Sequence, residues 1–228
     1  MKVLSVTRDL LLGLPVSAYI FDNDGTLVET EYAWYEAYER LLHPYGLMHS
    51  MEVHRLMMGQ SPRACIETLQ RAHSKLPQGE AGIATLQPER RRLFRAVRHE
   101  KGIRPIAGAD AFLQDARVRR IPIAMATSAT REDITSQNQQ LGWDQYFPVI
   151  VTADDVERHK PEPDVYLAAA RVLGVDPERC LAFEDAANGL LSARAAGMLT
   201  VFLRDPRFGM SPPFVPTIAV QDFRDLLT

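Results

Sequence analysis

The chain has 228 residues, of which 46% are hydrophobic, and its 26 basic and 29 acidic side chains give a formal net charge of -3. This length suffices for a buried core, and the charge excludes the strong basic field that draws proteins to nucleic acid or anionic membranes. Two cysteines, Cys65 and Cys180, are too few for a disulfide framework. The sequence has no apolar stretch of the roughly 20 residues that span a bilayer, and charge interrupts the N-terminus too early for a signal peptide. We therefore expect a globular, cytoplasmic protein with no nucleic-acid or membrane partner.

Four short apolar segments predict buried strands, because each stops at a polar cluster. They comprise residues 16–21, 121–126, 180–183 and 199–203, and helix-like stretches lie among them at residues 109–117, 164–173 and 188–196. Strands that alternate with helices predict an α/β fold with a Rossmann-like, three-layer core around a parallel sheet. Because the carboxyl ends of parallel strands meet at one edge, we expect the polar residues that follow these strands to converge.

Residues 31–104 have helical periodicity and no convincing strand. Breaks marked by glycine and proline are predicted at residues 43–46, 76–79 and 87–88. We interpret this interval as an α-helical cap inserted into a core formed by residues 1–30 and 105–228. Its cluster of arginines is typical of a solvated helix face, and comprises Arg90, Arg91, Arg92, Arg95 and Arg98.

The end of the first strand carries two carboxylates, Asp22 and Asp24, separated by one residue. In a continuing strand they would share a face, which suits a hard divalent cation such as Mg²⁺. Gly25 permits a close turn after them, although the same composition is also typical of a simple turn. The other strand ends and the loop before residue 164 add further polar candidates, namely Thr127, Lys160, Glu184 and Asp185. Each alone fits a helix cap or a solvated side chain, but the ordered set favours a site.

This ordered set resembles the haloacid dehalogenase-like superfamily of phosphotransferases, and within it the phosphatases and β-phosphoglucomutase-like enzymes with a helical cap. The resemblance extends over residues 19–201. The Asp-x-Asp-Gly-Thr motif falls at residues 22–26, and the later motifs fall at Thr127, Lys160, and Glu184 with Asp185.

The resemblance implies a Mg²⁺-dependent phosphatase that acts on a small phosphate ester, a sugar phosphate or another phosphorylated metabolite, with Asp22 as nucleophile and an aspartyl-phosphate intermediate. Asp24 would act as general acid and base, Thr127 would donate to a phosphoryl oxygen, and Lys160 would neutralise charge. The implied metal ligands are Asp22, the main-chain carbonyl of Asp24, Asp185, and Glu184 directly or through water.

Asp24 favours phosphoryl transfer, because the dehalogenases of the superfamily need no acid for a halide and lack this residue. The sugar-phosphate mutases carry a cap histidine a few residues after the first motif, where residues 31–34 contain none. A mutase of the β-phosphoglucomutase type is the alternative, with His43 or His54 as a substitute. A catalytically silent binding protein is a more remote one.

The cap is expected to select the substrate. Candidate substrate contacts are Ser128 beside the second motif and, in the cap, Trp34, Gly59 and Arg63. Arg63 would bind a second anionic group. Ser61 also fits the cap of the helix that follows, with Pro62 in its first turn, and Trp34 fits packing within the cap equally well.

Overall fold

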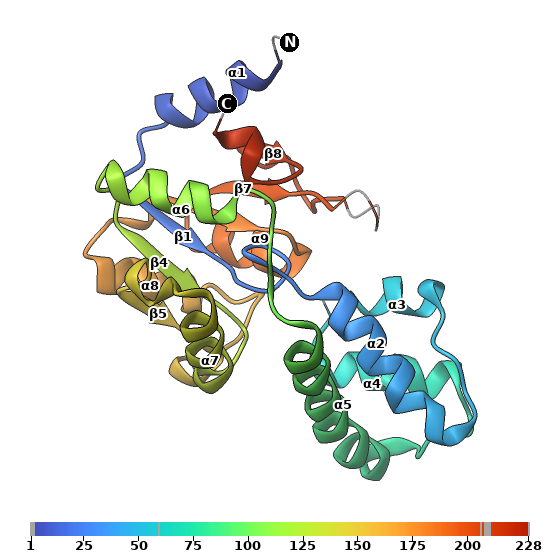
Figure 1. Cartoon of the computed structure of the whole chain (residues 1–228). Helices are drawn as coiled ribbons and strands as arrows, with labels where there is room; N and C mark the ends of the chain where they lie inside the picture. Colours follow the sequence, from blue (N-terminus) through green and yellow to red (C-terminus); the bar gives the residue numbers. More distant parts are fainter. Residues whose placement is uncertain (1–2, 59, 206, 208–210, 228) are drawn as a thin grey trace. The chain divides into compact units, whose positions relative to one another are not determined.

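The computed structural model describes residues 3–58, 60–205, 207 and 211–227, with the backbone alone described for residues 3–7. The chain divides into two compact units (Figure 1). The first unit combines Met1–Glu29 with Arg104–Thr228, and the second is Thr30–Ile103. The first unit is the α/β core that positions the candidate site, and the second is helical.

The core is built on a six-stranded sheet in the order β5-β4-β1-β6-β7-β8, in which every pairing is parallel. The strands are β1 (Ala18–Phe21), β4 (Ile123–Ala126), β5 (Val149–Val151), β6 (Cys180–Glu184), β7 (Leu199–Leu203) and β8 (Ile218–Val220). The expected α/β, Rossmann-like fold is therefore confirmed. β1 lies between β4 and β6, where the strand order reverses, and ligands bind at this switch point in open parallel sheets.

The two faces of β1 bury different side chains. Ala18 and Ile20 pack with residues of α8 (Asp164–Leu173) and α9 (Ala187–Ala195). On the other face, Phe21 stacks on Phe183 of β6 with ring centroids 4.4 Å apart, and α6 (Ala109–Val118) adds another ring, Phe112. Small residues on one face and aromatic rings on the other hold helices against both sides of the sheet.

Several helices and strands of the core were not predicted from the sequence. They are α1 (Val3–Gly13), α7 (Arg131–Leu141), the strands β5 and β8, and the short antiparallel pair of β2 (Val28–Glu29) with β3 (Arg104–Pro105). α7 is largely polar and buries few apolar residues, so its helical periodicity is weak. The missed strands have only two or three residues each, which is too short for a clear pattern.

The second unit consists of α2 (Glu31–Leu42), a 3₁₀ turn (His43–Tyr45), α3 (Met51–Met57), α4 (Pro62–Ala72) and α5 (Gly79–Lys101). The break predicted at residues 87–88 is wrong, because α5 continues through Pro88. Proline removes a backbone donor and disfavours a helix interior by about 3 kcal/mol. Buried residues on both sides of Pro88, including Leu86 and Leu93, pack into the unit's core and keep the helix continuous.

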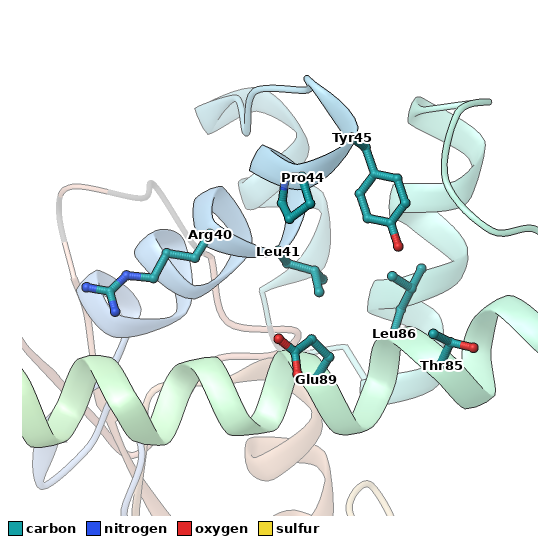
Figure 2. A pocket seen from close by; sticks show the side chains of 7 residues that line it. All are labelled: Arg40, Leu41, Pro44, Tyr45, Thr85, Leu86 and Glu89. Atoms are coloured by element: carbon teal, nitrogen blue, oxygen red, sulfur yellow. The ribbon is translucent and has the colours of Figure 1, made fainter.

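The arginine cluster departs from the expected solvated face at Arg90, which is only 8% exposed. Its guanidinium lies 4.3 Å from the Trp34 ring centroid and donates to the Tyr38 hydroxyl at 2.8 Å. A hollow of about 200 Å³ lies elsewhere in the same unit, with Leu41 and Leu86 among its lining residues (Figure 2). The residues that line it include none of those expected to form the site.

None of the helices in the described part of the chain combines the length and the apolar character needed to cross a bilayer.

Candidate active site

The loop after β1 places the first two carboxylates. The Asp22 amide donates to the Phe183 carbonyl at 3.0 Å, which extends the pairing of β1 with β6. The Asn23 carbonyl then accepts from the amides of Leu27 and Val28 at 2.8 and 3.1 Å, so the chain reverses tightly. Gly25 lies within this turn at φ +83°. The loop is therefore held by its own backbone.

Gly25 also makes room for a carboxylate from the end of β6. A Cβ atom at this position would lie 2.1 Å from Oδ2 of Asp185, far inside van der Waals contact. Oδ1 of Asp185 accepts from the Thr26 hydroxyl at 3.0 Å. The first motif therefore contacts Asp185 at two successive positions: Gly25 leaves room for its carboxylate, and the Thr26 hydroxyl donates to it.

Lys160 joins the ends of three strands. Its ammonium donates to Asp22 Oδ1 at 2.7 Å, to Glu184 Oε1 at 2.6 Å and to the Ala126 carbonyl at 3.0 Å. The side chains of Lys160, Asp22 and Glu184 are 7%, 10% and 1% exposed. Tyr166 of α8 donates a second hydrogen bond, of 2.6 Å, to Glu184 Oε1. The expected convergence of polar groups at one edge of the sheet is present.

Burial and mutual charge shift the titration of these groups. Burial raises the pKa of the Asp22 carboxyl, and the Lys160 ammonium opposes that rise. Burial alone would lower the pKa of Lys160, but Asp22 and Glu184 outweigh it and raise that pKa above its usual range. Lys160 therefore remains a fixed cation beside the nucleophile expected from the sequence.

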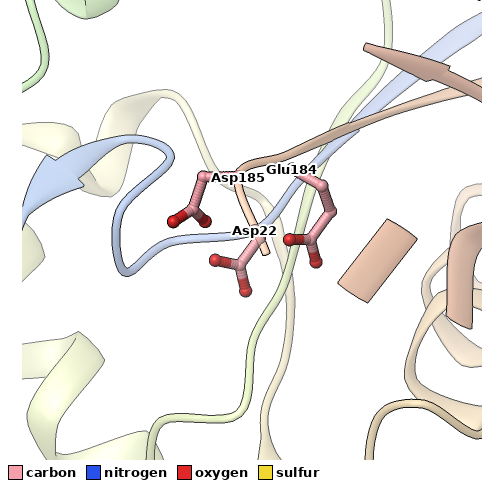
Figure 3. A group of neighbouring side chains, drawn as sticks. All are labelled: Asp22, Glu184 and Asp185. Atoms are coloured by element: carbon pink, nitrogen blue, oxygen red, sulfur yellow. The ribbon is translucent and has the colours of Figure 1, made fainter. Parts of the chain in front are cut away.

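The donor set fits a hard divalent cation. Asp22, Glu184 and Asp185 each offer a carboxylate oxygen, and these atoms lie within 4.8 Å of one another (Figure 3). Carboxylate oxygens are the ligands that Mg²⁺ prefers. Lys160 donates to one oxygen of Asp22 and to one of Glu184, and Tyr166 adds a second hydrogen bond to that Glu184 oxygen. The hydrogen bonds described for the ammonium include none to Asp185, so Asp185 and the second oxygen of Asp22 are the better placed ligands.

The second motif lies at the end of β4. Thr127 is 1% exposed, and its hydroxyl oxygen accepts from the Ala129 amide at 3.0 Å. An accepting hydroxyl keeps its hydrogen for donation, as the expected phosphoryl contact requires. Ser128, the next residue, is exposed.

The expected substrate contacts of the cap have defined surroundings within their own unit. Arg63 is exposed and forms ion pairs with Glu67 and Glu80. Trp34 stacks on Phe94 with ring centroids 3.7 Å apart, so it packs the cap. Gly59 lies outside the described residues. Their roles toward a substrate stay predictions.

The structure gives the contacts of two residues that the alternative interpretations name. Ser61 does cap α4, because its hydroxyl accepts from the Ala64 amide at 3.2 Å. His54, one of the two histidines named for the mutase alternative, is buried; its Nδ1 lies 3.0 Å from His49 Nε2 and its Nε2 lies 2.9 Å from Glu31 Oε2. Its role toward a substrate stays a prediction.

The site also includes Tyr166, Gly189 and Gln137, which the sequence alone does not indicate as site residues. A Cβ atom on Gly189 of α9 would lie 1.8 Å from Glu184 Oε1, so this glycine makes room for the buried carboxylate. Gln137 of α7 contacts the side chain of Asn23. A glycine in a helix and a glutamine in a polar helix carry no sequence signal of such contacts.

Comparison with known proteins identifies the family. The model of the haloacid dehalogenase-like hydrolases matches residues 19–203. The chain belongs to this family. The resemblance to this family is thus confirmed over the whole of the interval 19–201 on which it was based.

Curated relatives of this family include the "Phosphorylated carbohydrates phosphatase" of Thermotoga maritima, 31% identical over 82% of this chain and 84% of that protein. The "Fructose-1-phosphate phosphatase YqaB" of Escherichia coli is 34% identical over 81% of this chain and 95% of that protein. Among solved structures, CbbY from Rhodobacter sphaeroides in complex with phosphate has a TM-score of 0.77 at 27% identity, covering 92% of this chain and 96% of that chain. The expected enzyme class, a phosphoric monoester hydrolase, is confirmed by the family and its phosphatase members.

Proposed function

We propose that the protein is a Mg²⁺-dependent phosphatase that hydrolyses a small phosphorylated metabolite, a sugar phosphate, through an aspartyl-phosphate on Asp22. The observation that carries this proposal is the buried contact of Lys160 with Asp22 and Glu184, with Asp185 beside them. It sets a nucleophilic carboxylate against a fixed cation, at the edge of the sheet where ligands bind. The names of the phosphatase relatives support a carbohydrate phosphate as substrate.

In the first half-reaction, a carboxylate oxygen of Asp22 attacks phosphorus and the bond from phosphorus to the leaving oxygen breaks. Asp24 delivers its proton to that oxygen, so the product leaves as an alcohol. The Lys160 ammonium offsets the charge of Asp22 and of the phosphoryl group, and the Thr127 hydroxyl donates to a phosphoryl oxygen and holds the group in line. In the second half-reaction, Asp24 takes a proton from water, which attacks phosphorus and releases inorganic phosphate and the Asp22 carboxylate.

The metal belongs to the same proposal. Asp22 and Asp185 would hold Mg²⁺, with the main-chain carbonyl of Asp24 as a further expected ligand. Bound Mg²⁺ supplies positive charge that offsets the charge of the phosphoryl oxygens. Glu184 acts through Lys160, because its Oε1 accepts from the ammonium. The helical unit would select the substrate.

We also propose that the protein is located in the cytoplasm, which cell fractionation would test.

The test measures inorganic phosphate released from a panel of sugar phosphates and from 4-nitrophenyl phosphate. We expect turnover with Mg²⁺, its loss in EDTA, and its return when Mg²⁺ is added back. Asp22→Asn should abolish turnover, and acid-quenched wild-type enzyme should carry phosphate on the peptide that contains Asp22. Asp176→Asn is the matched control, because this residue caps a 3₁₀ turn and asparagine caps equally well. Full activity in Asp22→Asn would refute the nucleophile assignment.

Product analysis separates this proposal from the mutase alternative. A phosphatase releases free sugar and inorganic phosphate in equal amounts from a hexose 1-phosphate, whereas a mutase returns the isomeric hexose phosphate.

A further inference from the structure

A pair of buried carboxamides links the first motif to α7. Asn23, between the two aspartates, is 0% exposed, and Gln137 is 1% exposed. Gln137 Nε2 donates to Asn23 Oδ1 at 2.6 Å, and Asn23 Nδ2 donates back to Gln137 Oε1 at 3.2 Å. This reciprocal contact joins side chains 114 positions apart in the sequence.

The same Asn23 nitrogen also reaches the second aspartate. Nδ2 lies 3.1 Å from Asp24 Oδ1 and donates to it. A carboxamide nitrogen has two hydrogens, so one can serve Gln137 and the other Asp24. A rotated Asn23 amide would set its oxygen against the Asp24 carboxylate and against Gln137 Oε1, where no hydrogen bond is possible. Gln137, oriented as it is here, therefore pairs only with the Asn23 amide whose nitrogen faces Asp24.

We propose that Asn23 and Gln137 are positioning residues for Asp24 in its role as general acid. The inference rests on the proposed function, because it assumes that Asp24 protonates the leaving oxygen. An N–H donor to Oδ1 orients the carboxyl group and favours its proton on Oδ2. Because the contact is buried, losing it is costly: a buried amide that loses its partner has no water to replace it.

The leaving group provides a readout that a purely structural role would not move. A sugar alkoxide is a poor leaving group and needs its proton during bond cleavage, whereas 4-nitrophenolate leaves without help. A general acid contributes about 10²–10⁴-fold where it is needed. A misplaced Asp24 should therefore slow hydrolysis of an alkyl phosphate far more than hydrolysis of 4-nitrophenyl phosphate.

The experiment compares kcat/KM on 4-nitrophenyl phosphate and on the best sugar phosphate of the panel, because kcat/KM reports the first half-reaction, in which the leaving group departs, and not the hydrolysis of the aspartyl-phosphate that both substrates share. For Gln137→Leu and Asn23→Leu we expect kcat/KM on the sugar phosphate to fall by about 10–100-fold, with less than about threefold change on the aryl phosphate. Asn138→Leu is the matched control, a buried amide on the same helix whose side-chain atoms have no hydrogen-bond partner among the described residues. It should leave both activities unchanged.

Gln137→Met covers the case in which the leucine variants do not fold. Methionine keeps the length of the side chain and buries no charge, but it exchanges no hydrogen bonds with the Asn23 amide, so a loss with the same selectivity is expected. Equal losses on both substrates, or no loss, would overturn the inference. Asp24→Asn separates the two levels of the argument. If it hydrolyses the sugar phosphate like the wild type, the acid role itself fails, whereas an inactive Asp24→Asn beside a normal Gln137→Leu overturns the positioning role alone.

Discussion

Replacing Gly189 by alanine should destabilise the protein and slow the enzyme. In an ordinary helix interior this change stabilises by about 1 kcal/mol, because alanine is the better helix former. Here the new Cβ atom would lie 1.8 Å from Glu184 Oε1 and 2.0 Å from Cδ. Ordinary contact begins near 3.4 Å, so the carboxylate must move by about 1.6 Å. Gly189→Ala is therefore expected to lower the free energy of unfolding, whereas the same change in an ordinary helix would raise it.

The cost follows from what Glu184 loses when it moves. Its Oε1 accepts from Lys160 and from Tyr166, both at 2.6 Å, and hydrogen bonds to charged groups contribute about 1.5–3 kcal/mol each. Allowing for partial relaxation, we expect the free energy of unfolding to fall by about 3 kcal/mol. Because Lys160 also contacts Asp22, kcat should fall by at least about tenfold.

Urea unfolding followed by circular dichroism, together with phosphate release, measures both effects. Gly13→Ala is the matched control, because a Cβ atom on this helical glycine would have nothing within 4 Å of it, and the change should be neutral or slightly stabilising. Glu184→Asp shortens the clashing side chain, so the double variant with Gly189→Ala should cost less than the sum of the single changes. Wild-type stability and kcat in Gly189→Ala, or strictly additive costs, would refute the reasoning.

Three further changes test the site and the cap. Lys160→Met should lower the free energy of unfolding by about 3 kcal/mol and kcat by at least about 10²-fold, because two buried carboxylates lose their cation; urea unfolding and phosphate release measure this. Asp185→Asn should raise the Mg²⁺ concentration for half-maximal activity more than about tenfold, and more than Glu184→Gln does, in a metal titration. Burial lowers the pKa of His49 to about 4, so the unfolded chain binds a proton that the folded chain does not, and stability is lost as pH falls below about 6.5. The free energy of unfolding, measured in urea, should be lower at pH 5.5 than at pH 7.5 by roughly 1 kcal/mol because of His49. If His49→Gln showed the same difference between the two pH values, this explanation would be wrong.

The sequence was sufficient for the parts of the site that depend on topology. Asp22, Lys160 and Glu184 meet because the strands are parallel and their carboxyl ends share an edge, which the alternation of strands and helices predicts. Gln137 and Gly189 escaped because their contacts are set by how α7 and α9 pack on the loops, and neither residue type indicates a partner. Tertiary packing also overrode local preference at Pro88, which lies inside a helix.

Glu184 and Asp185 are adjacent and chemically similar, but the geometry of the strand gives them different partners. Successive side chains of a strand point to opposite faces. Glu184 continues the face of Ala182, which packs with α8 and α9, and it meets Tyr166 there. Asp185, one position on, meets Thr26 of the first motif instead. Glu184 therefore binds Lys160, whereas Asp185 places its carboxylate beside that of Asp22, where a cation would bind.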